Sequence, residues 1–107
     1  MTGRVLAGLH LTLTLLVTSV MGAEPDAVIK KGRQIYNDKK CGICHVIDGK
    51  GGKSGPDLTL IGSKWDSTTL KTFMRDPRAL VPQGKMPSFR GSEDELDALV
   101  AYMASLK

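Results

Sequence analysis

The spacing of two cysteines and one histidine constrains this chain more than any other feature of its sequence. Residues 41–45 read Cys-Gly-Ile-Cys-His, and the pattern Cys-x-x-Cys-His is the signature of covalent c-type haem attachment. The thiols of Cys41 and Cys44 can each bond one vinyl-derived carbon of a single porphyrin, and His45 is then held under the ring. The motif therefore predicts one covalently attached haem c, with His45 as an iron ligand.

Three other kinds of Cys-x-x-Cys site compete with this interpretation. A structural zinc site usually takes four Cys or His ligands, whereas the chain has two cysteines and two histidines. One of these histidines, His10, lies in a segment that we expect to be removed. A thioredoxin-like pair is expected in a strand–helix–strand context, but helix and glycine-rich loop flank this motif. A plain disulfide that closes a small loop stays open as an alternative, and haem attachment is favoured.

The N-terminal segment has the features of a secretory signal peptide. Arg4 supplies a positive charge, residues 5–20 are mostly apolar, and small residues lead up to Ala23. We predict a signal peptide over residues 1–23, with cleavage after Ala23. The alternative is an uncleaved membrane anchor, because the apolar run approaches the roughly 18–20 residues of a membrane span. In both cases we expect residues 24–107 to form one domain outside the cytoplasm, in a bacterial periplasm.

The predicted domain is small for a protein that depends on its hydrophobic core alone. Residues 24–107 number 84, and at this size a core is only marginally stabilising. A buried haem would supply the missing apolar volume, and two thioether bonds would tether the chain to it. The domain contains few aromatic side chains: Tyr36, Trp65, Phe73, Phe89 and Tyr102.

Charge is distributed unevenly along the chain. Residues 30–90 carry 13 basic and five acidic side chains, whereas residues 91–107 carry one basic and four acidic side chains. A basic face of this kind often steers docking to an acidic partner, although lysines that simply solvate the surface would give the same count. We expect no nucleic-acid partner, because the chain is predicted to be exported and contains no nucleic-acid recognition motif.

Helical periodicity predicts an all-α domain. In a first helix after Pro25, Ile29, Gly32 and Tyr36 share one face. A glycine inside a helix costs about 1 kcal/mol relative to alanine, so Gly32 is best explained by the close approach of another helix. No strand-like alternation is found, and the glycine-rich stretch at 48–57 is predicted to be a loop.

Two further helices follow from capping and breaker signals. Asp66 begins a helix that should stop near Asp76, because proline at the next position disfavours helix there, and residues 79–91 are predicted to be a second loop. Ser92 and Glu95 form a capping box for the last helix, and we explain the acidic residues at its start by capping alone. Its apolar stripe comprises Leu96, Leu99, Val100, Met103 and Leu106.

The second iron ligand is predicted to be Met86. Once residues 1–23 are removed, no histidine besides His45 remains, which leaves methionine or an open coordination position. Met74 and Met103 lie on the apolar faces of predicted helices, where methionine is usually a core residue. Met86 instead lies in a loop and precedes a proline, so it can be presented to the free face of the ring. An open or displaceable sixth position is the alternative.

The chain closely resembles the class I cytochrome c family over residues 27–106. The position of the motif near the start of the domain distinguishes this class from the four-helix-bundle class, in which the motif is C-terminal. The resemblance implies three to four helices wrapped around one haem, with the first and last helices crossing. The resemblance rests on these residues: Gly32 and Tyr36, the motif at 41–45, Gly55-Pro56-Asp57-Leu58, Lys85-Met86-Pro87, and Leu99 with Tyr102.

The same resemblance implies roles for two further residues. In the family, the carbonyl oxygen of the proline that matches Pro56 accepts a hydrogen bond from the proximal histidine, which orients the imidazole. A simple loop proline is the alternative. For Trp65 the resemblance implies a hydrogen bond to a haem propionate, and a packed core position is the alternative.

A His45/Met86 pair would leave the iron without a position for substrate. We therefore expect a one-electron carrier that serves redox protein partners, and not an enzyme. One alternative is a haem c subunit that relays electrons within an exported oxidoreductase complex, for which a membrane anchor would be suited. A less favoured alternative is a protein that binds small ligands, or acts as a peroxidase, with a labile Met86 ligand.

Overall fold

The structure is a computed structural model that describes residues 3, 8, 12–14 and 25–107. The predicted cleavage point after Ala23 lies outside the described residues. None of the described helices is long and apolar enough to cross a membrane. The elements of the described part are, in order, α1 (Pro25–Asp38), η1 (Cys41–Ile43), β1 (Val46–Ile47), β2 (Lys50–Gly51), α2 (Ile61–Lys64), α3 (Ser67–Arg75), α4 (Pro77–Leu80) and α5 (Glu93–Ala104).

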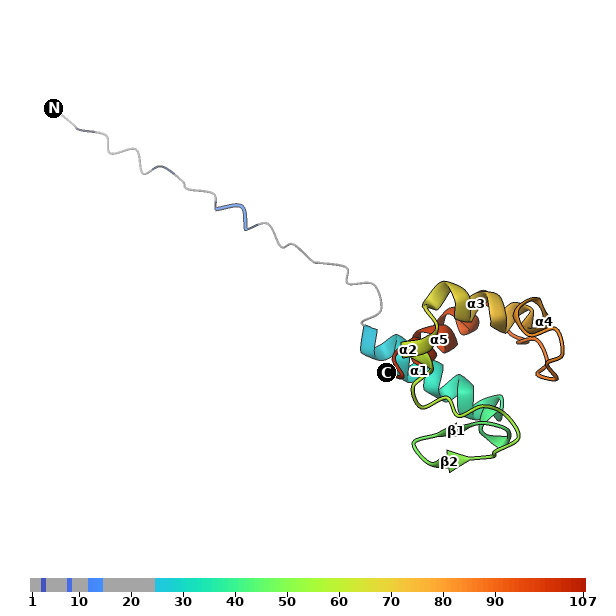
Figure 1. The fold of residues 1–107 in the computed structure, drawn as a ribbon. Coiled ribbons are helices and arrows are strands. Elements are labelled where there is room, and N and C mark those ends of the chain that lie inside the picture. The colour runs from blue at the N-terminus through green and yellow to red at the C-terminus, as the bar shows by residue number, and fades with distance from the viewer. Residues whose placement is uncertain (1–2, 4–7, 9–11, 15–24) are drawn as a thin grey trace.

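The predicted helical architecture is confirmed, and it is organised around the crossing of α1 and α5 (Figure 1). Gly32 lies at the crossing point: a Cβ atom there would collide with the carbonyl oxygen of Ala98 and lie 2.6 Å from Cβ of Tyr102. The rings of Tyr36 and Tyr102 pack edge to face, with centroids 5.8 Å apart. The close approach that we predicted from the glycine is therefore present.

The core is formed where α1, α3 and α5 meet. Leu70 of α3 and Leu99 of α5 are the most deeply buried large side chains, at 2% and 1% exposed. Five α-helices are described, more than the three to four expected, because α2 and α4 are short segments of four residues each. The other buried apolar residues are Ile35, Tyr36, Leu58, Met74, Leu96, Ala98, Val100, Tyr102 and Met103.

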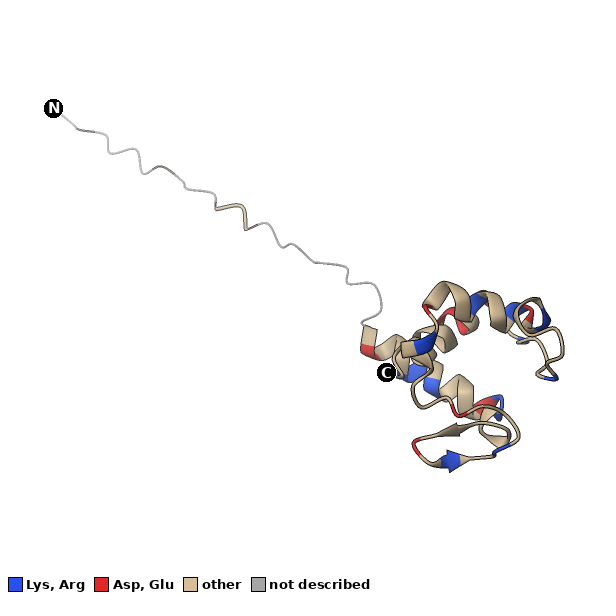
Figure 2. Cartoon of the chain, in the orientation of Figure 1, with Lys and Arg blue, Asp and Glu red and all other residues tan. Residues whose placement is uncertain are grey.

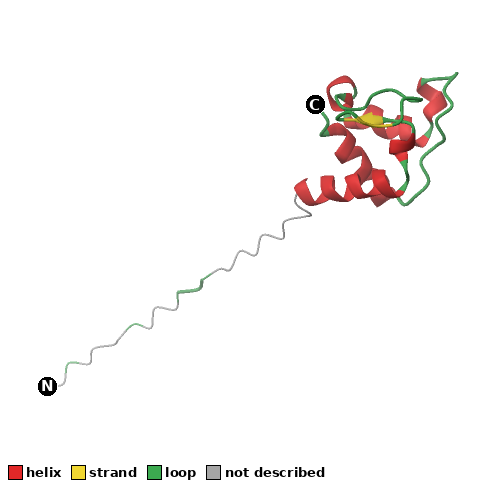
Figure 3. Cartoon of the chain, turned by 90° about the horizontal axis from the view of Figure 1, so that it is seen from below, coloured by secondary structure: helices red, strands yellow, loops and turns green. Residues whose placement is uncertain are grey.

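A small antiparallel hairpin corrects the prediction that strands are absent. Strands β1 and β2 pair with Val46 opposite Gly51 and Ile47 opposite Lys50, and Figure 3 shows the hairpin beside the helices. The two residues between the strands, Asp48 and Gly49, both have positive φ, at 50° and 78°. A two-residue turn with two positive φ values matches the twist of the flanking strands, and Asp-Gly is one of its preferred sequences.

Helix α3 begins and ends as predicted. The Asp66 carboxylate accepts a hydrogen bond from the Thr69 N–H (2.8 Å), and the helix ends at Arg75, one residue before Asp76. The predicted loop at 79–91, however, begins inside a short helix. Pro77 starts α4 because its fixed φ suits the first turn of a helix, where its missing N–H has no helical partner to lose.

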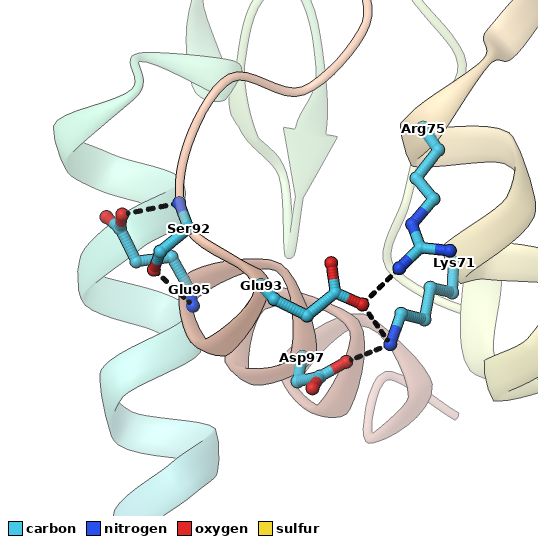
Figure 4. A network of polar contacts seen from close by, with 6 residues as sticks. All are labelled: Lys71, Arg75, Ser92, Glu93, Glu95 and Asp97. Atoms are coloured by element: carbon cyan, nitrogen blue, oxygen red, sulfur yellow. Dashed lines mark hydrogen bonds and ion pairs between the residues drawn. The ribbon is translucent and has the colours of Figure 1, made fainter.

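The capping box of α5 is confirmed, and the acidic residues near it have a further role that we did not predict. Figure 4 shows the reciprocal hydrogen bonds between Ser92 and Glu95, at 2.9 and 3.1 Å. It also shows an ion cluster between α3 and α5. Lys71 contacts Glu93 (2.9 Å) and Asp97 (2.5 Å), and Arg75 also contacts Glu93. These acidic side chains therefore join α5 to α3 as well as starting the helix.

Candidate haem site

The Cys-x-x-Cys-His motif forms a tight turn directly after α1. Lys40 adopts the left-handed conformation (φ 58°, ψ 34°), which reverses the chain before η1. The N–H groups of Cys44 and His45 both donate to the Cys41 carbonyl, at 3.2 Å. Both cysteines are free thiols, with Cys41 half-buried and Cys44 exposed. Burial is the main cause that raises the pKa of the Cys41 thiol.

His45 is buried, at 8% exposed, and its ring is oriented by the chain eleven residues later. Its Nδ1 atom lies 2.8 Å from the carbonyl oxygen of Pro56. A carbonyl oxygen can only accept a hydrogen bond, so Nδ1 carries the proton. In the neutral imidazole the lone pair is then on Nε2, which is free to bind a metal.

Gly55 makes room for this imidazole. A Cβ atom at Gly55 would lie 2.6 Å from Cε1 and 2.8 Å from Nδ1 of His45, which is too close for a side chain. The Gly55 N–H also donates to the Cys44 carbonyl (2.6 Å). The loop is thus tied to the motif on one side and lies against the imidazole on the other.

A second set of contacts connects the Pro56 loop to the hairpin turn. The Asp57 carboxylate accepts hydrogen bonds from the Thr59 N–H (2.8 Å) and hydroxyl (2.6 Å), and these lower the pKa of Asp57. The Thr59 hydroxyl in turn accepts from the Asp48 N–H (2.9 Å). Thr59 is not among the predicted site residues. The available signal was Asp-x-Thr directly after a proline, because Asp side chains commonly bond the backbone two residues ahead.

The donor set of the motif suits a haem better than a bare metal ion. In the part of the chain that the structure describes, no group of three or more His, Cys, Asp and Glu side chains is placed to hold a metal. The motif provides two free thiols and one imidazole with a free Nε2. A porphyrin supplies the in-plane ligands of its own iron, so this set fits a covalently attached haem and is incomplete for structural zinc.

Met86 lies on a different segment from the motif, in the loop between α4 and α5. Figure 1 shows this loop and the β1–β2 hairpin at separate ends of the fold. Met86 is half-buried and packs at the edge of the core, where it helps to line a cavity of about 400 Å³ with Arg78 and Lys85. Met74 and Met103 are each 5% exposed within helices, as expected for core residues.

Trp65 lies between α2 and α3. Its ring packs against Phe73, with centroids 5.0 Å apart and planes inclined at 55°, and the residue is half-buried. The structure shows no hydrogen bond from its indole N–H to another described residue. The predicted contact with a propionate stays a prediction.

The hydroxyl of Tyr36 is buried without a hydrogen-bond partner among the described residues. Burial, followed by the nearby Cys41 and Tyr102 groups, raises the pKa of Tyr36 to about 12. The ring also lies beside the motif, since a Cβ atom at Gly42 would be 3.7 Å from its Cε1. Tyr36 therefore packs the crossing of α1 and α5 against the attachment turn.

Comparison with known proteins matches residues 29–107 to the family described as Cytochrome c. Cytochrome c oxidase subunit 2 of Alkalihalophilus pseudofirmus is 31% identical over 91 residues, which cover 77% of this chain and 27% of that relative. Cytochrome c2 of Rhodoplanes tepidamans is 33% identical over 89 residues, which cover 62% of this chain and 82% of that relative. The chain thus spans about a quarter of the oxidase subunit. No solved structure gives a significant match.

Proposed function

The chain belongs to the class I cytochrome c family, and from this premise we propose that it carries single electrons through one covalently attached haem c. The haem supplies the Fe(II)/Fe(III) couple when it is bound. Cys41 and Cys44 would hold it through thioether bonds, and His45 would bind its iron. The protein contributes attachment, orientation and exclusion of water.

The hydrogen bond between His45 and Pro56 is the observation that carries this proposal. It assigns the proton to Nδ1 and so leaves Nε2 as the atom for the iron. The same bond orients the ring. A buried imidazole held this way next to two free thiols supports the proposed role of His45 as an iron ligand.

Met86 is our proposed ligand on the opposite side of the ring. The other two methionines of the domain are core residues, and no histidine besides His45 is present after residue 23. A soft thioether favours Fe(II), so a His/Met pair raises the reduction potential relative to two histidines. With His45 and Met86 as its ligands, the iron would have no position for a substrate, and the site would supply electron transfer.

Intact-mass spectrometry of the denatured, purified chain tests haem attachment directly. When the chain is produced in a periplasm together with a c-type maturation system, its mass should exceed that of the polypeptide by one haem. The Cys41→Ser/Cys44→Ser double variant should lose the increase. A wild-type chain without added haem under these conditions would refute the proposal.

A second candidate function is a haem c unit that relays electrons inside an exported oxidoreductase complex. The similarity to a segment of two oxidase subunits favours it. Stoichiometric co-purification of the chain with a membrane complex from its native cells would support this alternative. A free carrier would instead elute from a size-exclusion column at the size of the domain alone.

The proposed partners are redox proteins with acidic docking surfaces. Figure 2 shows Lys and Arg residues on the hairpin, on α3 and α4, and on the loop that follows them. Most acidic side chains at the start of α5 are engaged within the fold, by the capping box and the ion cluster. We infer that the exported domain works in the periplasm, free or attached by its N-terminal segment.

A further inference from the structure

The loop that carries Met86 is anchored at few points. Within the part of the chain that the structure describes, residues 85–91 donate one backbone–backbone hydrogen bond, from the Phe89 N–H to the carbonyl oxygen of Met74 (2.8 Å). Met74 is 5% exposed within α3, so its carbonyl belongs to a rigid part of the fold. Phe89, three residues after Met86, is therefore the point at which the backbone of the loop is attached.

The side chain of Phe89 reaches the other half of the candidate site. The Nζ atom of Lys39 lies 5.7 Å from the centroid of the Phe89 ring, within the range of a cation–π contact. Lys39 directly follows α1 and precedes Cys41 by two residues. The contact therefore connects the segment that leads into the haem-attachment motif with the loop that presents Met86.

The segment that leads into α5 contacts the Phe89 ring, and Glu95 in the first turn of α5 carries a charge opposite to that of Lys39. A Cβ atom at Gly91 would lie 2.8 Å from two ring carbons of Phe89, so the ring rests directly on the glycine. Glu95 accepts a hydrogen bond from the Ser92 N–H (2.9 Å). Hydrogen bonds from Ser92, followed by the charge of Lys39, lower the pKa of Glu95, so its carboxylate is ionised and attracts the Lys39 ammonium at neutral pH.

We propose that Lys39 and Phe89 form a latch that holds the Met86 loop against the haem-attachment segment. Both are positioning residues, because they act on the iron through Met86 and do not touch it. The role of the latch in ligation rests on the proposed function, in which Met86 is the second axial ligand. Opening of the loop breaks the Lys39–Phe89 contact together with the hydrogen bond of the Phe89 amide.

Hydrogen exchange of the Phe89 amide, measured by NMR on the haem-loaded ferrous protein, tests the latch. Lys39→Gln should accelerate this exchange about twofold to fivefold, because the loss of an exposed cation–π contact shifts the opening equilibrium of the loop by about that factor. Lys39→Arg should keep the wild-type rate, because it retains the cation. Lys30→Gln changes an exposed lysine within α1 and should have no effect. The Leu99 amide should exchange at the same rate in every variant, since the latch is local.

Combination with Phe89→Leu identifies the partner. Lys39→Gln should have no effect on exchange in the Phe89→Leu background. An unchanged Phe89 rate in Lys39→Gln, an equal acceleration in both backgrounds, or a parallel acceleration of Leu99 would each overturn the latch. The weak red absorption band of a thioether–iron bond, recorded on the ferric wild type, reports separately on Met86. Its absence would contradict the proposed ligation, while the Phe89 rates would still decide the latch.

Discussion

The Nδ1 atom of His45 lies 2.8 Å from the carbonyl oxygen of Pro56, across eleven residues of chain. The hairpin turn and the Asp57–Thr59 contacts together hold the Pro56 loop in place. Gly55 keeps the imidazole free of side-chain collisions. The orientation of the candidate iron ligand is thus a property of the polypeptide itself.

Gly55→Ala should disturb this orientation. The added methyl group would lie 2.6 Å from the His45 ring, and such overpacking typically costs about 1–3 kcal/mol. We expect a lower urea midpoint and a shifted reduction potential for the haem-loaded variant. Gly42→Ala is the matched control, because its methyl group would meet Tyr36 at an ordinary 3.7 Å. Equal effects of the two substitutions would contradict the role given to Gly55.

Gly32→Ala tests the crossing of α1 and α5. Alanine gains about 1 kcal/mol of helix propensity over glycine, but its methyl group would collide with the Ala98 backbone. A backbone atom cannot move aside as a flexible side chain can, so the collision should outweigh the propensity. We expect a net loss of about 1–3 kcal/mol in urea unfolding. Gln34→Ala, at an exposed site of the same helix, should leave stability unchanged or slightly raise it.

Glu93→Gln should weaken the attachment of α3 to α5. Hydrogen bonding to Lys71 is the main cause that lowers the pKa of Glu93. A carboxylate with a lowered pKa contributes stability above its unfolded pKa, and this contribution is lost as the pH falls through the folded value. We therefore expect a small destabilisation at neutral pH that shrinks below pH ~4 and in high salt. Asp94→Asn, at the next position, is the control, and thermal unfolding at several pH values is the measurement.

Tyr36→Phe should be tolerated or stabilising. The hydroxyl is buried without a described partner, so its removal relieves a desolvation cost of about 1–3 kcal/mol while the ring contact with Tyr102 is kept. Because the folded pKa of Tyr36 is raised to about 12, the wild type should lose stability as the pH rises from about 10 towards 12, and the variant should lose less. A clear destabilisation at neutral pH, measured by urea unfolding, would indicate a partner for the hydroxyl.

The features that could be predicted from the sequence depend on neighbouring residues. The start of α3 at Asp66 and the capping box of Ser92 and Glu95 follow from residues within three positions of each other. Gly32 is informative because glycine weakens a helix, so its presence inside one indicates that a neighbouring segment lies too close for a side chain. The Asp48-Gly49 turn was also a local signal, but its position in a glycine-rich stretch led us to predict a loop.

The features that could not be predicted join segments far apart in the chain. Lys71 meets Asp97 across 26 residues, and the Phe89 ring meets Lys39 across 50 residues. Periodicity shows that α3 and α5 each have an apolar face, but not which charged side chains lie opposite each other once those faces pack. For Met86, ligation depends on a haem that lies between two segments of the fold, so it stays a prediction.

The absorption spectrum of the ferric, haem-loaded protein tests the central claim, a haem c with His45 and Met86 as its axial ligands. The wild type should show the weak red band of a thioether–iron bond. Met86→Ala should abolish this band, and Met74→Leu, a change in the core of α3, should retain it. A wild-type spectrum without the band, or a band that persists in Met86→Ala, would contradict the account.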